Sequence, residues 1–174
     1  MNEYNEILER YTSIDWKKLF KEEIVSEDFI RHFSNKVDWN IASRIKLSES
    51  FIREFANKVD WRSISYYQTL SEDFIREFAD KVDWERISYN QKLSESFIRE
   101  FADKVDWKII SFSQRLSEGF IREFANKLDW TDISQIQTLS EDFIREFKDK
   151  VHWSVIFESQ VLSDSFREEF KDML

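Results

Sequence analysis

The sequence contains no cysteine and no proline, and its only glycine is Gly119. Without cysteine, disulfide bridges and thiolate metal sites are excluded. Because proline is absent and glycine nearly so, collagen-like chains, flexible linkers and proline-rich ligands are excluded as well. What remains is a chain rich in side chains that either form helices or fill a core.

Basic residues are also too few to give the chain a positive charge. Lys and Arg number 26 against 35 Asp and Glu, so the formal net charge is −9. A surface that follows nucleic-acid phosphates needs clustered Lys and Arg, and so does attraction to an anionic membrane. The N-terminal MNEYNEILERY lacks the apolar run of a signal peptide, and no segment is apolar enough to span a bilayer. We therefore expect a cytoplasmic protein with no nucleic-acid and no membrane partner.

Aromatic residues are abundant, with 17 Phe, 7 Trp and 5 Tyr, and they recur at a fixed period. The clearest unit is LSEDFIREFADKVDW, from Leu70 to Trp84. The tryptophans are spaced by 23 residues, except for a spacing of 22 where one residue is missing in NIASRIKL; they are Trp16, Trp39, Trp61, Trp84, Trp107, Trp130 and Trp153. Such a period predicts a repeat protein whose units are stabilised by their neighbours.

Each unit is expected to form two short helices. Ser71 can cap the first helix, on which Phe74, Ile75 and Phe78 form one apolar face. With no glycine available, we expect this helix to end at Asp80 in a left-handed turn, because Asp and Asn tolerate that conformation best. The equivalent positions are Asn35, Asn57, Asp103, Asn126 and Asp149.

The second helix is predicted over residues 84–90, with Val82 and Ile87 facing inward. Asp83 is its predicted N-cap, a position occupied in other units by Asp15, Asp38, Asp60, Asp106 and Asp129 and, as an exception, by His152. Isolated helices shorter than about 12–15 residues are marginal in water, so neighbouring units must cover both faces.

The predicted fold is therefore all-α: a right-handed α-solenoid of about seven helix–turn–helix repeats with a capping helix at each end. We expect a single repeat domain over 1–174, with an N-terminal cap at 1–15, repeats over 16–161 and a C-terminal cap helix at 162–174. The N-terminal cap is predicted from one apolar helical stripe, formed by Tyr4, Ile7, Leu8 and Tyr11. The C-terminal cap is predicted from Arg167, which replaces an isoleucine found in all six earlier copies. This change is expected if the isoleucine packs on the following unit, because no unit follows here.

The repeat is similar in kind to the helix pairs of tetratricopeptide and HEAT solenoids, although its period is shorter. The motif FIREFxxKVDWxxISxxQxLSExF more closely resembles short tandem repeats in uncharacterised proteins of giant DNA viruses. This resemblance covers the chain from Val25 to Phe170. This resemblance implies a viral or amoeba-associated origin and binding to a host protein, and it implies no defined activity.

The constant polar rows suit structural roles better than chemical ones. The Asp row is too regular for acid–base catalysis, which needs two carboxylates in different environments. The two histidines, His32 and His152, each stand alone in a unit, so no metal site is expected. The sequence contains no Ser-His-Asp arrangement and no Gly-rich phosphate loop. We expect no enzyme activity, no catalytic residue, no cofactor and no metal.

Three other rows each allow two interpretations. The tryptophans are predicted to be core residues with locally satisfied N–H groups, and the alternative is a stacking platform. The Arg-Glu pairs are predicted to form charge ladders between units, and the alternative is a clamp for acidic peptides. The glutamine row is predicted to bind loop backbone or adjacent units, and the alternative is a ligand role; its members are Gln68, Gln91, Gln114, Gln137 and Gln160.

The positions that vary inside this constant frame are the best candidates for binding. Five and six residues after each tryptophan, side-chain identity changes from unit to unit, and the first of these rows could form an aromatic wall. The candidate binding residues are Tyr66, Tyr67, Tyr89, Asn90, Phe112 and Gln135. The alternative is sequence drift combined with partial burial against the next unit.

A capped array with a variable aromatic row predicts a monomeric, non-enzymatic scaffold for protein–protein or peptide binding. The alternative function is a structural, self-assembling repeat protein with no small ligand. It would form homo-oligomers through repeat edges or end caps.

Overall fold

A computed structural model of the chain describes residues 18–20 and 25–173, over which all regular structure is helical. The chain divides into two compact units, Met1–Ile87 and Ser88–Leu174, and each is considered by itself. Repeated helix pairs in both units confirm the predicted all-α, solenoid-type architecture. The handedness of the solenoid and the single domain over 1–174 stay predictions. The predicted N-terminal cap at 1–15 lies outside the described residues, as does Trp16.

The first helix of each repeat is six residues long. The seven described copies are α3 (Glu27–His32), α5 (Glu49–Glu54), α7 (Glu72–Glu77), α9 (Glu95–Glu100), α11 (Glu118–Glu123), α13 (Glu141–Glu146) and α15 (Asp164–Glu169). Each begins after a serine whose hydroxyl accepts a backbone N–H, as Ser71 Oγ accepts from Phe74 N over 3.2 Å. Acidic residues in the first turn and arginine in the last turn complement the helix dipole.

The predicted left-handed turn at Asp80 is wrong. Helix α7 ends at Glu77, and its C-cap Phe78 has φ −112° and ψ 29°. Lys81 N and Val82 N then both donate to the Phe78 carbonyl, over 2.8 and 3.1 Å. These bonds close a turn without a left-handed residue, and no described residue has a positive φ. The same correction holds for Asn35, Asn57, Asp103, Asn126 and Asp149.

The second helices are α4 (Trp39–Ala42), α6 (Trp61–Tyr67), α8 (Trp84–Asn90), α10 (Trp107–Ser113), α12 (Trp130–Ile136) and α14 (Trp153–Ser159), followed after α15 by the short 3₁₀ helix η1 (Lys171–Met173). The bounds of α8 match the prediction. Helix α4 has four residues where the other second helices have seven, and its repeat lacks one residue. No helix in the described ranges has the length and apolar character needed to cross a bilayer.

The predicted aspartate caps of the second helix are confirmed. Ser63 N donates to Asp60 Oδ2 over 3.1 Å, and Arg86 N donates to Asp83 Oδ1 over the same distance. Asp38, Asp106 and Asp129 act likewise, whereas His152 makes no side-chain cap bond. The equivalent Asp15 lies outside the described residues.

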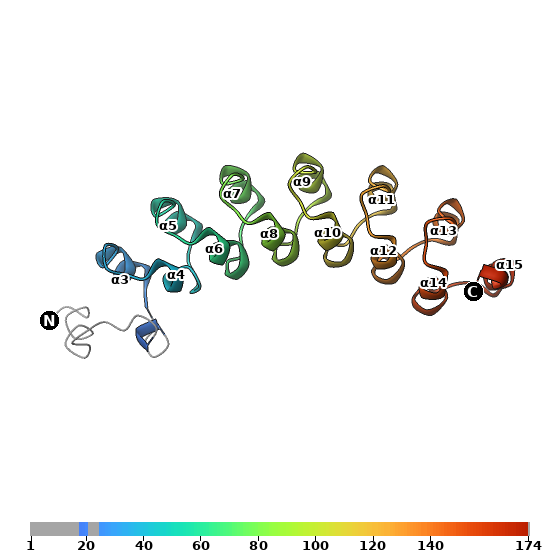
Figure 1. Cartoon of the computed structure of the whole chain (residues 1–174), viewed down its shortest axis with the longest axis horizontal. Coiled ribbons are helices and arrows are strands. Elements are labelled where there is room, and N and C mark those ends of the chain that lie inside the picture. The colour runs from blue at the N-terminus through green and yellow to red at the C-terminus, as the bar shows by residue number, and fades with distance from the viewer. Residues whose placement is uncertain (1–17, 21–24, 174) are drawn as a thin grey trace. The chain divides into compact units, whose positions relative to one another are not determined.

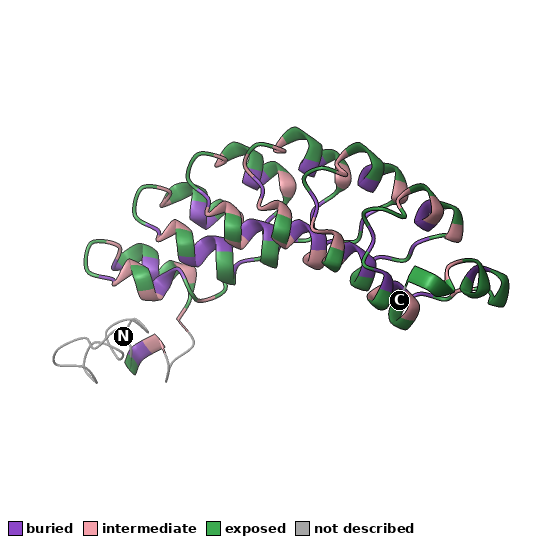
Figure 2. Ribbon diagram, turned by 45° about the vertical axis from the view of Figure 1, so that its right-hand side comes forward, coloured by how far each residue is buried: buried purple, intermediate pink, exposed green. Residues whose placement is uncertain are grey.

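Within each unit, the first helices lie in one row and the second helices in a facing row (Figure 1). The buried positions lie between the two rows, and the outer sides are exposed (Figure 2). Phe97, Ile98 and Ile110 have no exposed surface, and each such burial contributes about 1.5–3 kcal/mol. The core of each unit is therefore the seam between its two rows of helices.

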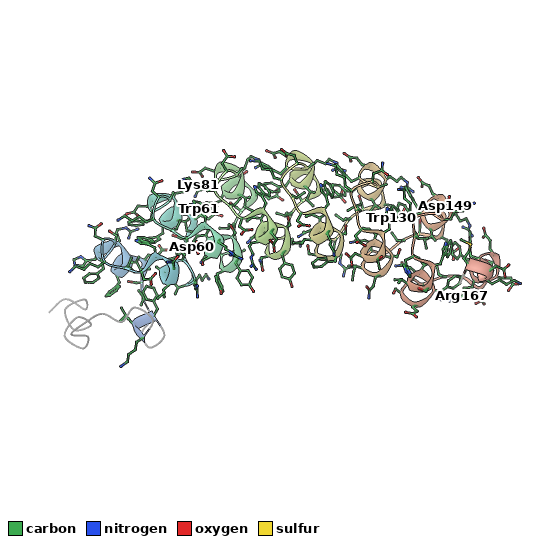
Figure 3. The ribbon with its side chains drawn as sticks, viewed as in Figure 1. Asp60, Trp61, Lys81, Trp130, Asp149 and Arg167 are labelled. Atoms are coloured by element: carbon green, nitrogen blue, oxygen red, sulfur yellow. The ribbon has the colours of Figure 1, made fainter. Side chains whose placement is uncertain are left out.

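The described tryptophans are structural residues that join successive repeats; Trp153 is buried and the others are half-buried. The ring of Trp61 lies 4.7 Å from that of Phe78 in the next repeat, and its Nε1 donates to the Ala56 carbonyl over 3.0 Å. Lys81 Nζ covers the indole at 5.8 Å from the ring centroid (Figure 3). The prediction of a packed ring with a locally satisfied N–H is confirmed, and the stacking-platform alternative loses its exposed ring face.

Candidate functional site

The glutamine row joins repeats through buried side-chain amides. Gln137 Oε1 accepts from Leu116 N over 3.0 Å, and its Nε2 donates to the carbonyls of Ser111 and Gln114 over 3.2 and 2.8 Å. Gln68, Gln114 and Gln160 make the same kind of contacts. The predicted backbone-binding role is confirmed, and the amides are occupied by the protein itself.

Two further constant rows join repeats and were missed by sequence reasoning. Ser134 Oγ donates to the Trp130 carbonyl over 2.6 Å and accepts from His152 N of the next repeat over 2.9 Å. Glu141 Oε1 accepts from Ser163 N over 2.6 Å, and this hydrogen bond lowers the pKa of Glu141. The signal was present in the sequence, because both residues recur at fixed positions in the unit.

The predicted Arg-Glu ladder is confirmed. Arg122 Nε donates to Glu146 Oε2 of the next repeat over 2.8 Å, and its guanidinium lies 4.9 Å from the Phe143 ring centroid. Further rungs join Arg31 to Glu54, Arg53 to Glu77, Arg99 to Glu123 and Arg145 to Glu169. Since these arginines are already paired with carboxylates, the alternative of an acidic-peptide clamp built from this row is not supported.

Both histidines contact neighbouring residues in the sequence. The ring of His32 lies edge-on against Phe33, with centroids 4.6 Å apart, and His152 Nδ1 lies 3.1 Å from Ser154 Oγ. Over residues 18–20 and 25–173, no three His, Cys, Asp or Glu side chains are grouped as a metal ion would need.

The predicted binding residues lie on the surface in both units. In the first unit, Tyr66 and Tyr67 are 40% and 52% exposed, and their rings meet edge to face at 4.7 Å. In the second unit, Tyr89 is 56% exposed and its ring lies 5.9 Å from Phe112, which is half-buried. Asn90 and Gln135 are exposed. The structure thus brings Tyr89 and Phe112 together, and the participation of Tyr66 in one aromatic wall stays a prediction.

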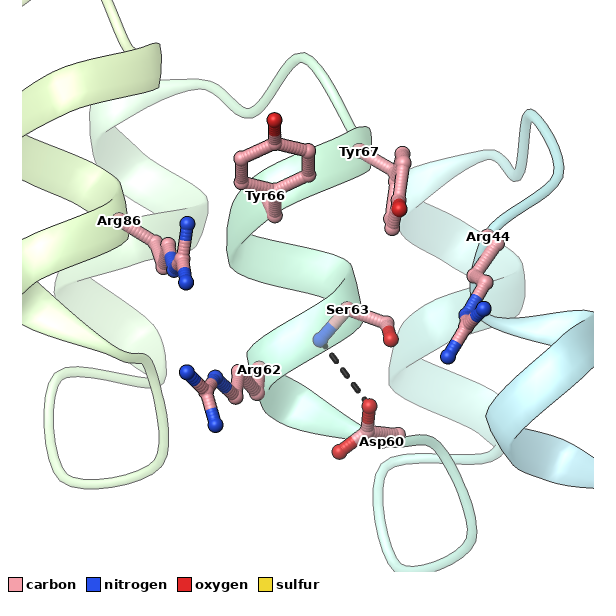
Figure 4. A pocket seen from close by; sticks show the side chains of 7 residues that line it. All are labelled: Arg44, Asp60, Arg62, Ser63, Tyr66, Tyr67 and Arg86. Carbon is pink, nitrogen blue, oxygen red and sulfur yellow. Dashed lines mark hydrogen bonds between the residues drawn. The ribbon is translucent and has the colours of Figure 1, made fainter.

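The two tyrosines of the first unit border an open cleft of about 340 Å³ (Figure 4). Besides Tyr66 and Tyr67, its lining residues are Arg44, Asp60, Arg62, Ser63 and Arg86. The guanidinium of Arg86 lies 4.9 Å from the centroid of the Tyr66 ring. Sequence reasoning identified the tyrosines and missed the arginines, although Arg44 stands five residues after Trp39, in the same variable row as Tyr66.

The second unit has two grooves where the loops after successive second helices lie side by side. One, of about 360 Å³, is lined in part by Tyr89, Asn90, Lys92, Ser113 and Arg115. The other, of about 180 Å³, is lined in part by Gln135, Ile136, Thr138, Ser159 and Val161. The same frame therefore presents a cationic groove in one place and an uncharged one in another.

Comparisons with protein-family models, with curated proteins and with solved structures found no match for this chain. The resemblance to repeat proteins of giant DNA viruses gains no support from them.

Proposed function

We propose that the protein is a non-enzymatic scaffold that binds a protein or peptide partner through the variable surface after its second helices. The proposal is supported by a difference between the constant and the variable side chains of the repeat. The constant Ser, Asp, Gln and Trp side chains bind the protein's own backbone, as Ser71, Asp60, Gln137 and Trp61 illustrate. At the variable positions, by contrast, Tyr66, Tyr67 and Tyr89 are exposed.

The observation that carries the proposal is the exposure of three tyrosines at these variable positions. Tyr66, Tyr67 and Tyr89 are 40–56% exposed, although the other aromatic rows are packed between repeats. Tyrosine is enriched among the anchor residues of protein interfaces, because it buries a large rigid surface and keeps a polar group at its tip. A partner is therefore expected to contact the second-helix side of the repeats.

The recurrent carboxylates support a non-enzymatic role. Asp60, Asp83 and Asp106 all accept backbone N–H groups at the start of a helix. An acid–base pair would need carboxylates whose environments differ, whereas these three share one environment. Their repetition is what a structural cap requires.

Affinity capture with the full chain tests the proposal. Bait proteins would be the wild type, a Tyr66→Ala/Tyr67→Ala variant and a Tyr89→Ala/Phe112→Ala variant. Lys148→Ala is the matched control, because alanine already stands at this position in other repeats, such as Ala125. A partner retained by wild type and control and lost by a tyrosine variant supports the scaffold. Identical capture by all four proteins contradicts it.

A second candidate function is self-assembly, favoured by one feature of the uncharged groove. Val161 is 99% exposed and lines this groove together with Ile136, which is 41% exposed. In other repeats the position of Val161 holds a polar residue, as Arg115 and Thr138 show. Concentration-dependent sedimentation that disappears in Val161→Thr would favour this function, and a monomer at all concentrations would exclude it.

A further inference from the structure

We propose that the cleft of the first unit binds an acidic peptide segment, with Arg44 and Arg62 recognising its carboxylates, Arg86 adding positive charge, and Tyr66 and Tyr67 contacting the chain between them. This inference rests on the proposed scaffold function and specifies the chemistry of the partner.

Two of the cleft arginines, Arg44 and Arg62, differ from the arginines of the ladder in how they are paired. The guanidinium of Arg44 makes no hydrogen bond or ion pair with any described residue. Arg62 is 72% exposed and its Nε lies 3.9 Å from Asp83 Oδ2, at the outer limit of an ion pair. By contrast, a ladder arginine such as Arg53 lies 2.7 Å from its carboxylate. Arg44 and Arg62 therefore keep donors that a ligand can use.

The carboxylates near the cleft are already engaged. Asp60 accepts from Ser63 N over 3.1 Å, and Asp83 accepts from Arg86 N over 3.1 Å. Both are helix caps, so one oxygen of each carboxylate is turned toward a backbone N–H group. Three guanidinium groups thus lie around one cleft in a chain whose net charge is −9, and an incoming anion finds its attraction concentrated there.

The arrangement of the arginines favours several carboxylates along an extended segment over a single compact anion. In Figure 4, the side chains of Arg62 and Arg86 lie on one side of α6 and that of Arg44 lies on the other side. Tyr67 lies between Tyr66 and Arg44. Guanidinium groups bind carboxylates with two parallel hydrogen bonds, which fixes the orientation of each acidic side chain. Tyr66 and Tyr67 supply apolar surface between these points.

The second unit offers an internal comparison. Its first groove holds Lys92 and Arg115 beside Tyr89, and its second groove, with Gln135 and Thr138, holds no basic residue. The backbone of the repeat is the same in both units. The positive charge of the first-unit cleft therefore comes from side chains at positions that differ from repeat to repeat. Selection of an acidic partner is expected to be a property of this cleft more than of the uncharged groove.

Fluorescence anisotropy of the full chain with three labelled peptides tests the inference. In the first peptide glutamates alternate with leucines, in the second each glutamate is replaced by glutamine, and in the third each glutamate is replaced by phosphoserine. The test variant is Arg44→Glu/Arg62→Glu. The control is Lys108→Glu/Lys148→Glu, which makes the same charge change at exposed lysines outside the cleft, Lys108 being the counterpart of Arg62 in its repeat. Circular dichroism melting establishes that both variants are folded.

We expect the glutamate peptide to bind wild type and control, and to lose about tenfold or more in affinity for the test variant. Equal affinity for the glutamine peptide, or equal loss in the control, would overturn the inference. Binding of a phosphoserine peptide without binding of the glutamate peptide would overturn the carboxylate assignment. If the tyrosine variants still lose a captured partner in any of these cases, the scaffold function stands and only the acidic chemistry fails.

Discussion

The side-chain amide of Gln137 donates to the backbone carbonyl of Gln114, the corresponding residue of the preceding repeat, over 2.8 Å. One end of the same amide also accepts from Leu116 N. A single buried side chain therefore makes hydrogen bonds with backbone groups on both sides of Arg115, in the loop between α10 and α11. The glutamine row fixes how one repeat follows the next.

Gln137→Leu should lower the free energy of unfolding by about 2–3 kcal/mol, because buried backbone groups of Leu116, Ser111 and Gln114 lose their partner. Urea unfolding followed by circular dichroism measures the change. The exposed Gln135 is the matched control, and Gln135→Leu should stay within about 0.5 kcal/mol of wild type. Similar stability of the two variants would contradict the role assigned to the row.

His152→Asp should stabilise the protein by about 0.5–1 kcal/mol. His152 occupies the N-cap of α14 without a side-chain cap bond, whereas Asp129 caps α12 by accepting from Thr131 N and Asp132 N. Thermal unfolding at neutral pH measures the gain. Asp129→His should produce a loss of similar size, and an unchanged melting temperature in both variants would mean that these caps are energetically neutral.

Asp132→Asn should make the protein more stable at neutral pH and leave it unchanged in acid. Partial burial and the nearby Asp129 raise the pKa of Asp132, while Lys108 opposes the shift. A folded-state pKa above the ordinary value of about 3.9 means that ionised Asp132 lowers stability, a cost that grows as pH rises through the folded pKa and vanishes below the unfolded one. Unfolding free energies of both proteins from acid to neutral pH test this, and a constant difference would refute the assignment.

Glu146→Gln should cost only about 0.2–1 kcal/mol, because the Arg122–Glu146 rung is exposed and solvent screens it. The loss should shrink as salt is added, since screening weakens the wild-type rung and leaves the variant little affected. Urea unfolding at low and high salt measures both. A large loss that is independent of salt would show that Glu146 acts through packing instead.

The elements that depend on local chemistry could be predicted from the sequence. Ser71 and Asp83 cap their helices because a hydroxyl or carboxylate at that spacing meets exposed backbone N–H groups. The bounds of α8 follow from the same signals. The turn at Asp80 could not be predicted in this way, because the hydrogen bonds to Phe78 that close it leave no compositional mark.

The candidate site could be predicted only in part. Tyr66, Tyr67 and Tyr89 occupy variable positions in aligned rows, so a comparison of repeats reveals them. Arg44 stands five residues after Trp39, in the same variable row as Tyr66, so the same comparison of repeats also reveals it. Arg86 stands two residues after Trp84, outside these rows, and only the folded structure places it beside Tyr66 in the cleft.

The glutamine contacts have a consequence for how such a chain can change in length. The amides of Gln68, Gln114, Gln137 and Gln160 each bind the copy that precedes them through backbone groups, so the contact does not depend on which side chains that copy carries. Duplication or excision of one whole copy would recreate the same contact at the new boundary, while the exposed tyrosines and arginines could be exchanged independently. The sequence thus behaves as a modular coding unit, in which array length and surface specificity can be altered by separate genetic events.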